Sequence, residues 1–108
     1  MNAVANKIYI KKLESVIFHL LGSTAKHVET VPVHEVFRGK TVWQGRVEVF
    51  DLADHPKAKR CYAWSYKVDG EEKFVTVAEI PPVTSPETAV KVAVANEVKE
   101  ARKAMGKK

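Results

Sequence analysis

Basic side chains gather around one histidine in residues 53–60, which read Ala-Asp-His-Pro-Lys-Ala-Lys-Arg. Lysine and arginine side chains hold the phosphate groups of nucleic acids, and they also attract the carboxylates of acidic proteins. The candidate binding residues of this segment are His55, Lys57, Lys59 and Arg60. Asp51 and Asp54 lie close by and reduce the positive field, so the alternative is a solvated loop whose charges keep the domain in solution.

A second basic segment lies near the end of the chain. Its candidate residues are Lys99, Arg102 and Lys103, which belong to a predicted helix. Such a segment can act as an electrostatic arm for nucleic acid. Acidic residues are interspersed with these bases, however, and mixed charge at helical spacing is typical of a solvated helix face.

Aromatic residues alternate with small or polar ones in residues 61–68, which read Cys-Tyr-Ala-Trp-Ser-Tyr-Lys-Val. A period of two indicates a strand, and predicted strands on both sides place it in the middle of a sheet. Tyr62, Trp64 and Tyr66 then share a face. If exposed, they would form a platform on which bases stack. We favour a core position, because aromatic side chains dominate small cores, and keep Trp64 as a candidate for partner contact.

The sequence contains no recognisable catalytic or metal-binding pattern. Its four histidines lack the spacing of a metal site, and the single cysteine, Cys61, can form neither an intrachain disulfide nor a cysteine-based metal site. All five glycines are isolated, so there is no glycine-rich phosphate loop. We therefore predict a protein that is not an enzyme and that uses no cofactor or metal. An enzyme with a small pocket between sheet and helices is the least favoured hypothesis.

The net charge of the chain is unevenly distributed. The formal charge is +5, with +3 in residues 1–40, −1 in residues 41–80 and +3 in residues 81–108. This excess permits an anionic partner without requiring one. We expect a cytoplasmic protein that does not enter a membrane, because there is no signal-peptide pattern and the apolar run at residues 16–21 is too short to cross a bilayer.

Apolar spacing and turn residues predict the order of the elements. We expect a helix over residues 7–21, a loop over 23–30, strands over 31–37, 42–51, 61–68 and 74–80, and a helix over 85–104. At the start, a short strand over residues 8–10 before a shorter helix is the alternative. Strand 31–37 belongs at a sheet edge, because Pro32 lacks a backbone donor.

Local signals predict where these elements begin and end. Asn6 is the expected cap and Gly22 the expected stop of the first helix. Asp69-Gly70 predicts a hairpin turn. Ser85-Pro86 predicts a capped helix start, although a glutamate that would complete a capping box is replaced by threonine at residue 88. Gly45 and the region of Phe50 are the expected sites of bulges.

The predicted fold class is α+β. Short loops between successive strands favour a three- or four-stranded antiparallel sheet with two helices packed on one face, in the order α-(β)-β-β-β-α. The length of 108 residues fits a single domain over residues 1–108. We expect residues 1–5 and 105–108 to be frayed.

This order in a small basic domain resembles the double-stranded RNA-binding domain over residues 42–104. That family places a histidine in a loop that enters the RNA minor groove, and residues 54–57 (Asp-His-Pro-Lys) place His55 in the corresponding loop. The family also has a Ser-Lys-Lys-x-Ala-Lys segment at its last helix. Residues 85–90 (Ser-Pro-Glu-Thr-Ala-Val) match its serine and alanine and lack its lysines. The resemblance implies an α-β-β-β-α fold and contact with double-stranded RNA.

Two functions follow as hypotheses. The first is a non-enzymatic module that binds nucleic acid or another acidic partner through a basic surface. The second is a protein–protein interaction or homodimerisation module that uses an exposed aromatic face or the edge strand at residues 31–37.

Overall fold

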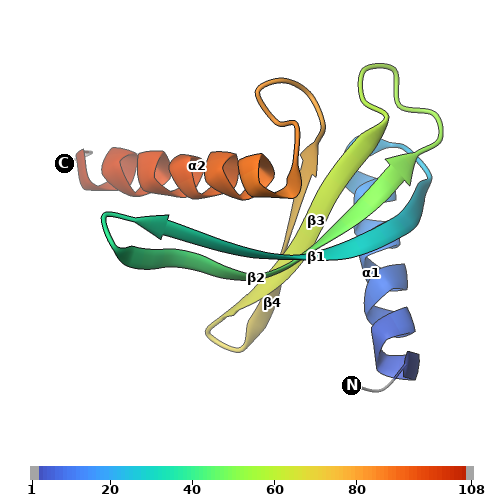
Figure 1. Cartoon of the computed structure of the whole chain (residues 1–108), viewed down its shortest axis with the longest axis horizontal. Helices are drawn as coiled ribbons and strands as arrows, with labels where there is room; N and C mark the ends of the chain where they lie inside the picture. Colours follow the sequence, from blue (N-terminus) through green and yellow to red (C-terminus); the bar gives the residue numbers. More distant parts are fainter. Residues whose placement is uncertain (1–2, 107–108) are drawn as a thin grey trace.

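The computed structural model describes the backbone of residues 3–106 and the side chains of residues 6–96 (Figure 1). The elements are helix α1 (Ala3–Leu21), strands β1 (Ala25–Phe37), β2 (Lys40–Leu52), β3 (Arg60–Val68) and β4 (Glu71–Ala78), and helix α2 (Pro86–Gly106). The strands form one antiparallel sheet in the order β1-β2-β3-β4. The predicted α+β class, with an antiparallel sheet and two helices, is confirmed.

Each helix packs against its own face of the sheet. Side chains alternate between faces along a strand. In β3, Cys61 and Ala63 belong to the apolar cluster that includes α1, whereas Tyr62 and Trp64 belong to the cluster that includes α2. The expectation that both helices share one face therefore does not hold. The physical reason is that the smaller side chains of β3, Cys61 and Ala63, are also apolar and are buried beneath α1.

The middle of the sheet is paired over a short stretch only. Strand β2 pairs with β3 over residues 48–51 and 60–63, although each pairs with its outer neighbour along most of its length. The sheet therefore divides into two hairpins that diverge from a common centre, which Figure 1 shows as the β1–β2 and β3–β4 arms.

Two indole rings pack on the α2 face where the two hairpins diverge. The ring centroids of Trp43 and Trp64 lie 5.6 Å apart in an edge-to-face arrangement. The Trp43 indole lies over Gly45, where a Cβ atom would come within 3.0 Å of Trp43 Cη2. Gly45 thus makes room for an aromatic ring. The bulge predicted there is wrong, because Gly45 pairs in register with Val33. The register skips Val28 in β1 and Val42 in β2 instead.

Residues 47–50 are buried without the usual alternation. Val49 packs in the cluster that includes α2 and Phe50 in the cluster that includes α1. A strand covered on both faces is buried at consecutive positions, so this run marks double burial, with Glu48 as its polar member. The irregularity expected near Phe50 lies in the partner strand, where the register skips Val28.

The first helix begins earlier and the first strand is longer than predicted. Helix α1 begins at Ala3, so Asn6 lies inside it and a strand over residues 8–10 is wrong. Gly22 ends the helix as predicted, with a φ of 67° that suits glycine. Strand β1 begins at Ala25, so residues 25–30 are not a loop: pairing with β2 outweighs their polar composition.

The later boundaries follow the turn and cap residues closely. Asp69 and Gly70 have positive φ angles and form a two-residue hairpin turn, so β4 begins at Glu71 rather than at residue 74. Helix α2 begins at Pro86 as predicted. Ser85 Oγ accepts a hydrogen bond from Thr88 N at 3.2 Å, and Thr88 Oγ1 accepts one from Ser85 N at 2.9 Å. Threonine thus completes the capping box in place of glutamate.

Candidate partner-binding surface

The loop between β2 and β3 is ordered by two of its own side chains. His55 Nδ1 accepts hydrogen bonds from the backbone N–H groups of Lys57 at 3.1 Å and Ala58 at 2.9 Å. Asp54 Oδ1 accepts bonds from the Ser23 hydroxyl at 2.8 Å and from a neighbouring backbone N–H. These bonds lower the pKa of Asp54. His55 therefore shapes the loop, because its acceptor nitrogen is already occupied.

The basic residues of this loop fall into two groups. Lys57 and Lys59 are exposed, and their side chains have no partner among the described residues. Arg60 Nε donates to Asp51 Oδ1 at 3.0 Å, which neutralises part of the predicted patch. The loop thus presents two free lysines, a weaker anion-binding group than the sequence predicts.

The other predicted contact residues do not join this loop. Trp64 is only 2% exposed and packs with the buried Tyr62 in the core of the α2 face, which confirms the core position expected for these two residues. Tyr66 is 39% exposed, so the same expectation does not hold for it. The side chains of Lys99, Arg102 and Lys103 lie outside the described residues. Figure 1 shows their part of α2 at the opposite end of the molecule from the β2–β3 loop. The predicted site residues therefore do not form one surface.

A different surface combines exposed apolar side chains with a free sheet edge. Helix α1 buries Leu13 and Ile17 but leaves Ile8, Phe18 and Leu20 largely exposed. The exposed residues flank the buried stripe, so α1 presents apolar groups both to the core and to solvent.

An open groove of about 460 Å³ runs between α1 and the edge strand β4. It is lined by Ser15, Val16, His19, Leu20, Glu72, Lys73 and Phe74. Val16 and Leu20 are one helical turn apart and supply the apolar wall, opposite Phe74. Leu20 is 64% exposed, so this wall is accessible to a partner.

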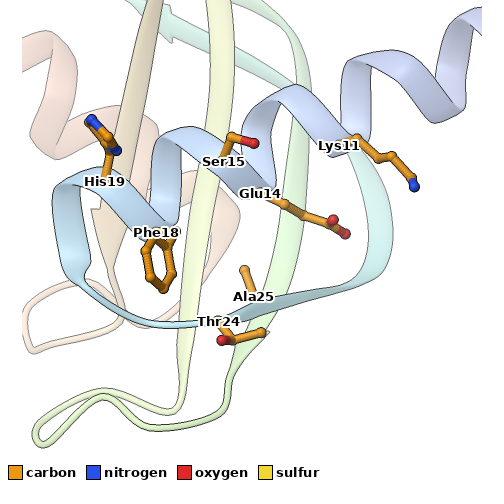
Figure 2. Close-up of a pocket in the computed structure, with 7 residues that line it drawn as sticks. All are labelled: Lys11, Glu14, Ser15, Phe18, His19, Thr24 and Ala25. Carbon is orange, nitrogen blue, oxygen red and sulfur yellow. The ribbon is translucent and has the colours of Figure 1, made fainter.

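A second open groove lies on the other side of α1, as Figure 2 shows. It has a volume of about 600 Å³, and Phe18 projects from the helix beside Thr24 and Ala25 at the entry to β1. Ser15 and His19 line both grooves. These two residues therefore lie on the part of α1 that separates the two grooves.

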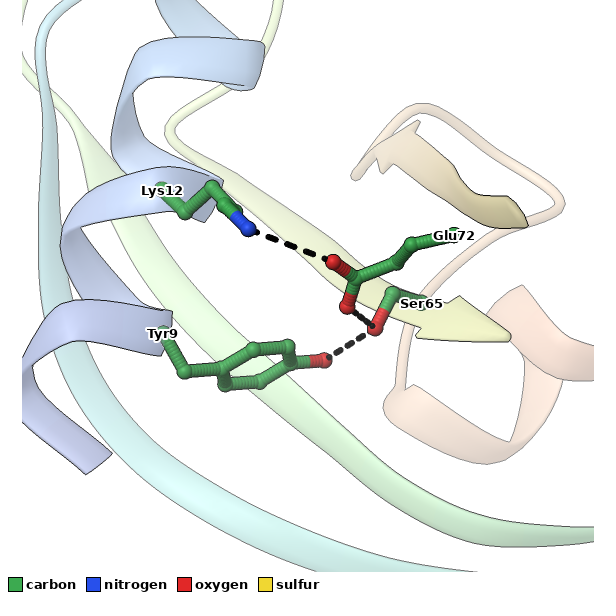
Figure 3. Close-up of polar contacts among 4 residues, drawn as sticks. All are labelled: Tyr9, Lys12, Ser65 and Glu72. Carbon is green, nitrogen blue, oxygen red and sulfur yellow. Dashed lines mark hydrogen bonds and ion pairs between the residues drawn. The ribbon is translucent and has the colours of Figure 1, made fainter. Parts of the chain in front are cut away.

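A chain of polar contacts holds α1 against the β3–β4 hairpin (Figure 3). Ser65 Oγ donates to Glu72 Oε2 at 2.8 Å and lies 3.1 Å from Tyr9 Oη. The other carboxylate oxygen of Glu72 lies 3.4 Å from Lys12 Nζ. The Ser65 bond and Lys12 lower the pKa of Glu72, whereas burial raises the pKa of Tyr9. These contacts set the spacing between α1 and β4, and thus the width of the groove.

The centre of the α1 face also contains a buried carboxylate. Glu48 is only 3% exposed, and its Oε1 atom contacts His27 Nε2 at 2.8 Å and Thr30 Oγ1 at 2.5 Å. The contacts satisfy a group whose burial would otherwise be costly. They join β1 to β2 on the face that α1 covers.

The Cys61 thiol is buried, and the metal-ligating side chains of the described residues are dispersed. Burial raises the pKa of Cys61 to about 12, so its thiol is a core group and a poor nucleophile at neutral pH. Within the described part of the chain, no group of three or more His, Cys, Asp or Glu side chains could hold a metal ion.

Comparisons with known proteins assign no family to this chain. A scan against protein-family models, a search of curated proteins and a search of solved structures each returned no match. The resemblance to the double-stranded RNA-binding domain stays a prediction. Among the described residues, no helix combines the length and the apolar character needed to span a bilayer.

The α1–β4 groove was not predicted from the sequence. A signal was present, because Ile8, Val16 and Leu20 follow a spacing of four or eight residues and lie beside the buried pair Leu13 and Ile17. A helix with two apolar stripes needs two partners. The position of β4 in the folded chain shows which surface the second stripe faces.

Proposed function

We propose that this protein is a non-enzymatic binding module that holds another protein against the groove between α1 and β4. The observation that carries the proposal is the apolar wall formed by the half-buried Val16 and the exposed Leu20 beside the edge strand. Partner surfaces of this kind bury apolar anchors within a polar rim. Here Ser15, His19 and Glu72 supply that rim.

The charges around the groove favour an acidic partner. On this side of the molecule, Lys12 and Lys67 lie near Glu72, and both carboxylate oxygens of Glu72 are already occupied by Lys12 and Ser65. Lys73 also lines the groove and is paired with Glu71 at 3.1 Å, so the excess charge of this group of side chains is one positive charge. Complementary charge mainly raises the association rate and the selectivity of binding.

The proposal is tested with a Leu20→Ser variant and a Phe37→Ser control. Phe37 is 61% exposed at the tip of the β1–β2 hairpin, so both changes remove an exposed apolar side chain of similar exposure. Random peptides displayed on phage would be selected on the full-length chain, and the enriched peptides synthesised and measured by fluorescence anisotropy. We expect Leu20→Ser to weaken their binding at least about tenfold and Phe37→Ser to leave it unchanged.

The same pair of variants tests a second copy of the chain as the partner. Light scattering would then give twice the monomer mass for the unmodified protein and the monomer mass for Leu20→Ser. A monomer that enriches no peptide over the Leu20→Ser variant would contradict the proposed function.

Binding of nucleic acid through the β2–β3 loop is the second candidate. It is favoured by the two free lysines, Lys57 and Lys59, on a loop whose shape is held by His55 and Asp54. Labelled double-stranded RNA, single-stranded RNA and DNA would be titrated at low and moderate salt. Salt-sensitive binding that is lost in a Lys57→Ala, Lys59→Ala variant supports this candidate. Binding that the variant retains excludes the loop as the site.

A further inference from the structure

We propose that the partner binds as an extended acidic segment that adds a fifth strand to the sheet along β4. This inference rests on the proposed function and names the form of the partner at the same groove. A peptide that pairs with an edge strand gains main-chain hydrogen bonds from the edge and selectivity from pockets for its alternate side chains. The structure provides both requirements at β4.

The free backbone groups of β4 follow from its register with β3. Glu79 N donates to Arg60 O at 2.9 Å, which identifies residues 60 and 79 as a hydrogen-bonded pair. Hydrogen-bonded pairs alternate along an antiparallel ladder, and β4 is the last strand of the sheet. Glu72, Phe74 and Thr76 therefore direct their backbone N–H and C=O groups away from β3.

The two edges of the sheet differ in how well they are protected. Edge strand β1 carries Pro32, which removes a backbone donor, and a bulge at Val28, where the register with β2 skips a residue. Proline and bulges are the features by which natural sheets block added strands. Strand β4 pairs with β3 in continuous register from Glu71 to Ala78 and contains no proline. The open edge is therefore β4, and the edge at residues 31–37 is the protected one.

The groove lies on the face to which the added strand would direct alternate side chains. Phe74 and Ala78 belong to the cluster on the α1 face, so residues paired with Phe74 or Thr76 would point to the same face. There they would meet Val16 and Leu20 of α1. The groove thus requires apolar side chains at alternate positions of the partner segment.

A buried hydroxyl on this edge points to the same conclusion. Thr76 Oγ1 is buried and has no hydrogen-bond partner among the described residues. Buried polar atoms are nearly always paired in native structures. Thr76 is one of the outward-directed positions of β4, so an added strand would bring donors and acceptors beside it.

Charge complementarity completes the description of the segment. Lys12 and Lys67 on the α1 face lie near one carboxylate, that of Glu72. Lys73 and Glu71 of the same edge form an ion pair, so one positive charge is left in excess. Acidic side chains at the ends of the apolar segment would therefore be attracted to this edge. Basic segments of the same apolar pattern would bind more weakly.

The test uses Thr76→Pro, with Thr76→Val as the matched control. Proline at an outward position removes the N–H that an added strand needs and leaves the ladder to β3 intact, a setting in which edge strands tolerate proline. Valine keeps that N–H group and the shape of the side chain. For peptides selected on the unmodified protein, we expect about a tenfold loss of affinity with Thr76→Pro and little change with Thr76→Val.

A second measurement does not depend on the folding of any variant. Each selected peptide would be synthesised in two forms, N-methylated on its odd or on its even residues, and titrated against the unmodified chain. Strand addition uses the N–H groups of alternate residues, so one form should lose binding and the other keep it. Exchanging acidic for basic residues in the peptide should weaken binding, and more so at low salt.

The outcomes separate this inference from the proposed function. Peptides that lose affinity for Leu20→Ser, yet bind Thr76→Pro normally and tolerate both N-methylated forms, would overturn strand addition and leave the binding groove in place. Peptides insensitive to Leu20→Ser would contradict both. Enrichment of basic peptides would overturn the acidic character of the partner.

Discussion

The two faces of the sheet are stabilised in different ways. The α2 face is an apolar cluster centred on Trp64 and several valines. The α1 face contains the buried carboxylate of Glu48 and the polar chain from Lys12 to Tyr9, and it leaves Leu20 exposed beside the edge strand. Apolar packing tolerates small shifts, whereas hydrogen bonds specify positions. Both faces thus contain an apolar core, and the α1 face adds polar contacts that position a surface.

The largest expected effect is on the α2 face. Trp64→Ala removes a buried indole and its contact with Trp43, and we expect a loss of about 3–5 kcal/mol in the free energy of unfolding. Tyr66→Ala is the control from the same strand, because Tyr66 is 39% exposed, and its cost should stay near about 1 kcal/mol. Urea unfolding followed by circular dichroism measures both. Equal losses would show that the aromatic strand is not organised around this core.

The next effect tests the polar character of the α1 face. Glu48→Ala leaves His27 and Thr30 without their acceptor in a buried setting, which should cost about 1–3 kcal/mol. Glu48→Gln keeps an acceptor oxygen and should cost clearly less. The free energies of unfolding at neutral pH give the comparison. A neutral Glu48→Ala would mean that this face, too, depends on apolar packing alone.

A smaller effect tests how tightly the Trp43 indole is packed where the two hairpins diverge. Gly45→Ala places a Cβ atom 3.0 Å from Trp43 Cη2 and must push the indole away from Trp64. We expect a cost of about 1 kcal/mol, the lower end for overpacking. In a Trp43→Leu background this cost should largely disappear, because the two changes share one contact. Additive costs would contradict the proposed role of Gly45.

The smallest expected effect is a dependence of the melting temperature on pH. The pKa values of Asp54 and Glu72 are lowered in the folded chain, so each carboxylate stabilises the fold above its unfolded pKa, and that contribution is lost as the pH falls through the folded value. Melting temperatures should therefore fall below about pH 4. Asp54→Asn and Glu72→Gln should lower the melting temperature slightly at neutral pH and leave it unchanged in acid. Equal differences at both pH values would contradict this linkage.

Much of the secondary structure could be predicted from short-range signals. The positive φ angles at Asp69 and Gly70 and the cap at Ser85 and Thr88 are local, since the residues that cause them are adjacent or one turn apart. Strand β1 from Ala25 was missed because its polar start is held by pairing with β2, which no local pattern reveals.

The candidate site could be predicted only in part. The sequence places Lys57 and Lys59 in an exposed loop, and the structure confirms this placement. It does not indicate that Asp51 neutralises Arg60, because a side-chain contact across a hairpin depends on register. Nor does it indicate which helix lies near which edge of the sheet.

The sequence by itself determined the α+β class, the hairpin turn at Asp69 and Gly70 and the start of α2, because these depend on side-chain alternation and on neighbouring residues. The tertiary structure decided which face each helix covers, where the sheet divides and that Val16 and Leu20 lie opposite Phe74. The physical reason is that an apolar stripe specifies burial but not the partner against which it is buried. The partner is selected by the packing of the whole chain.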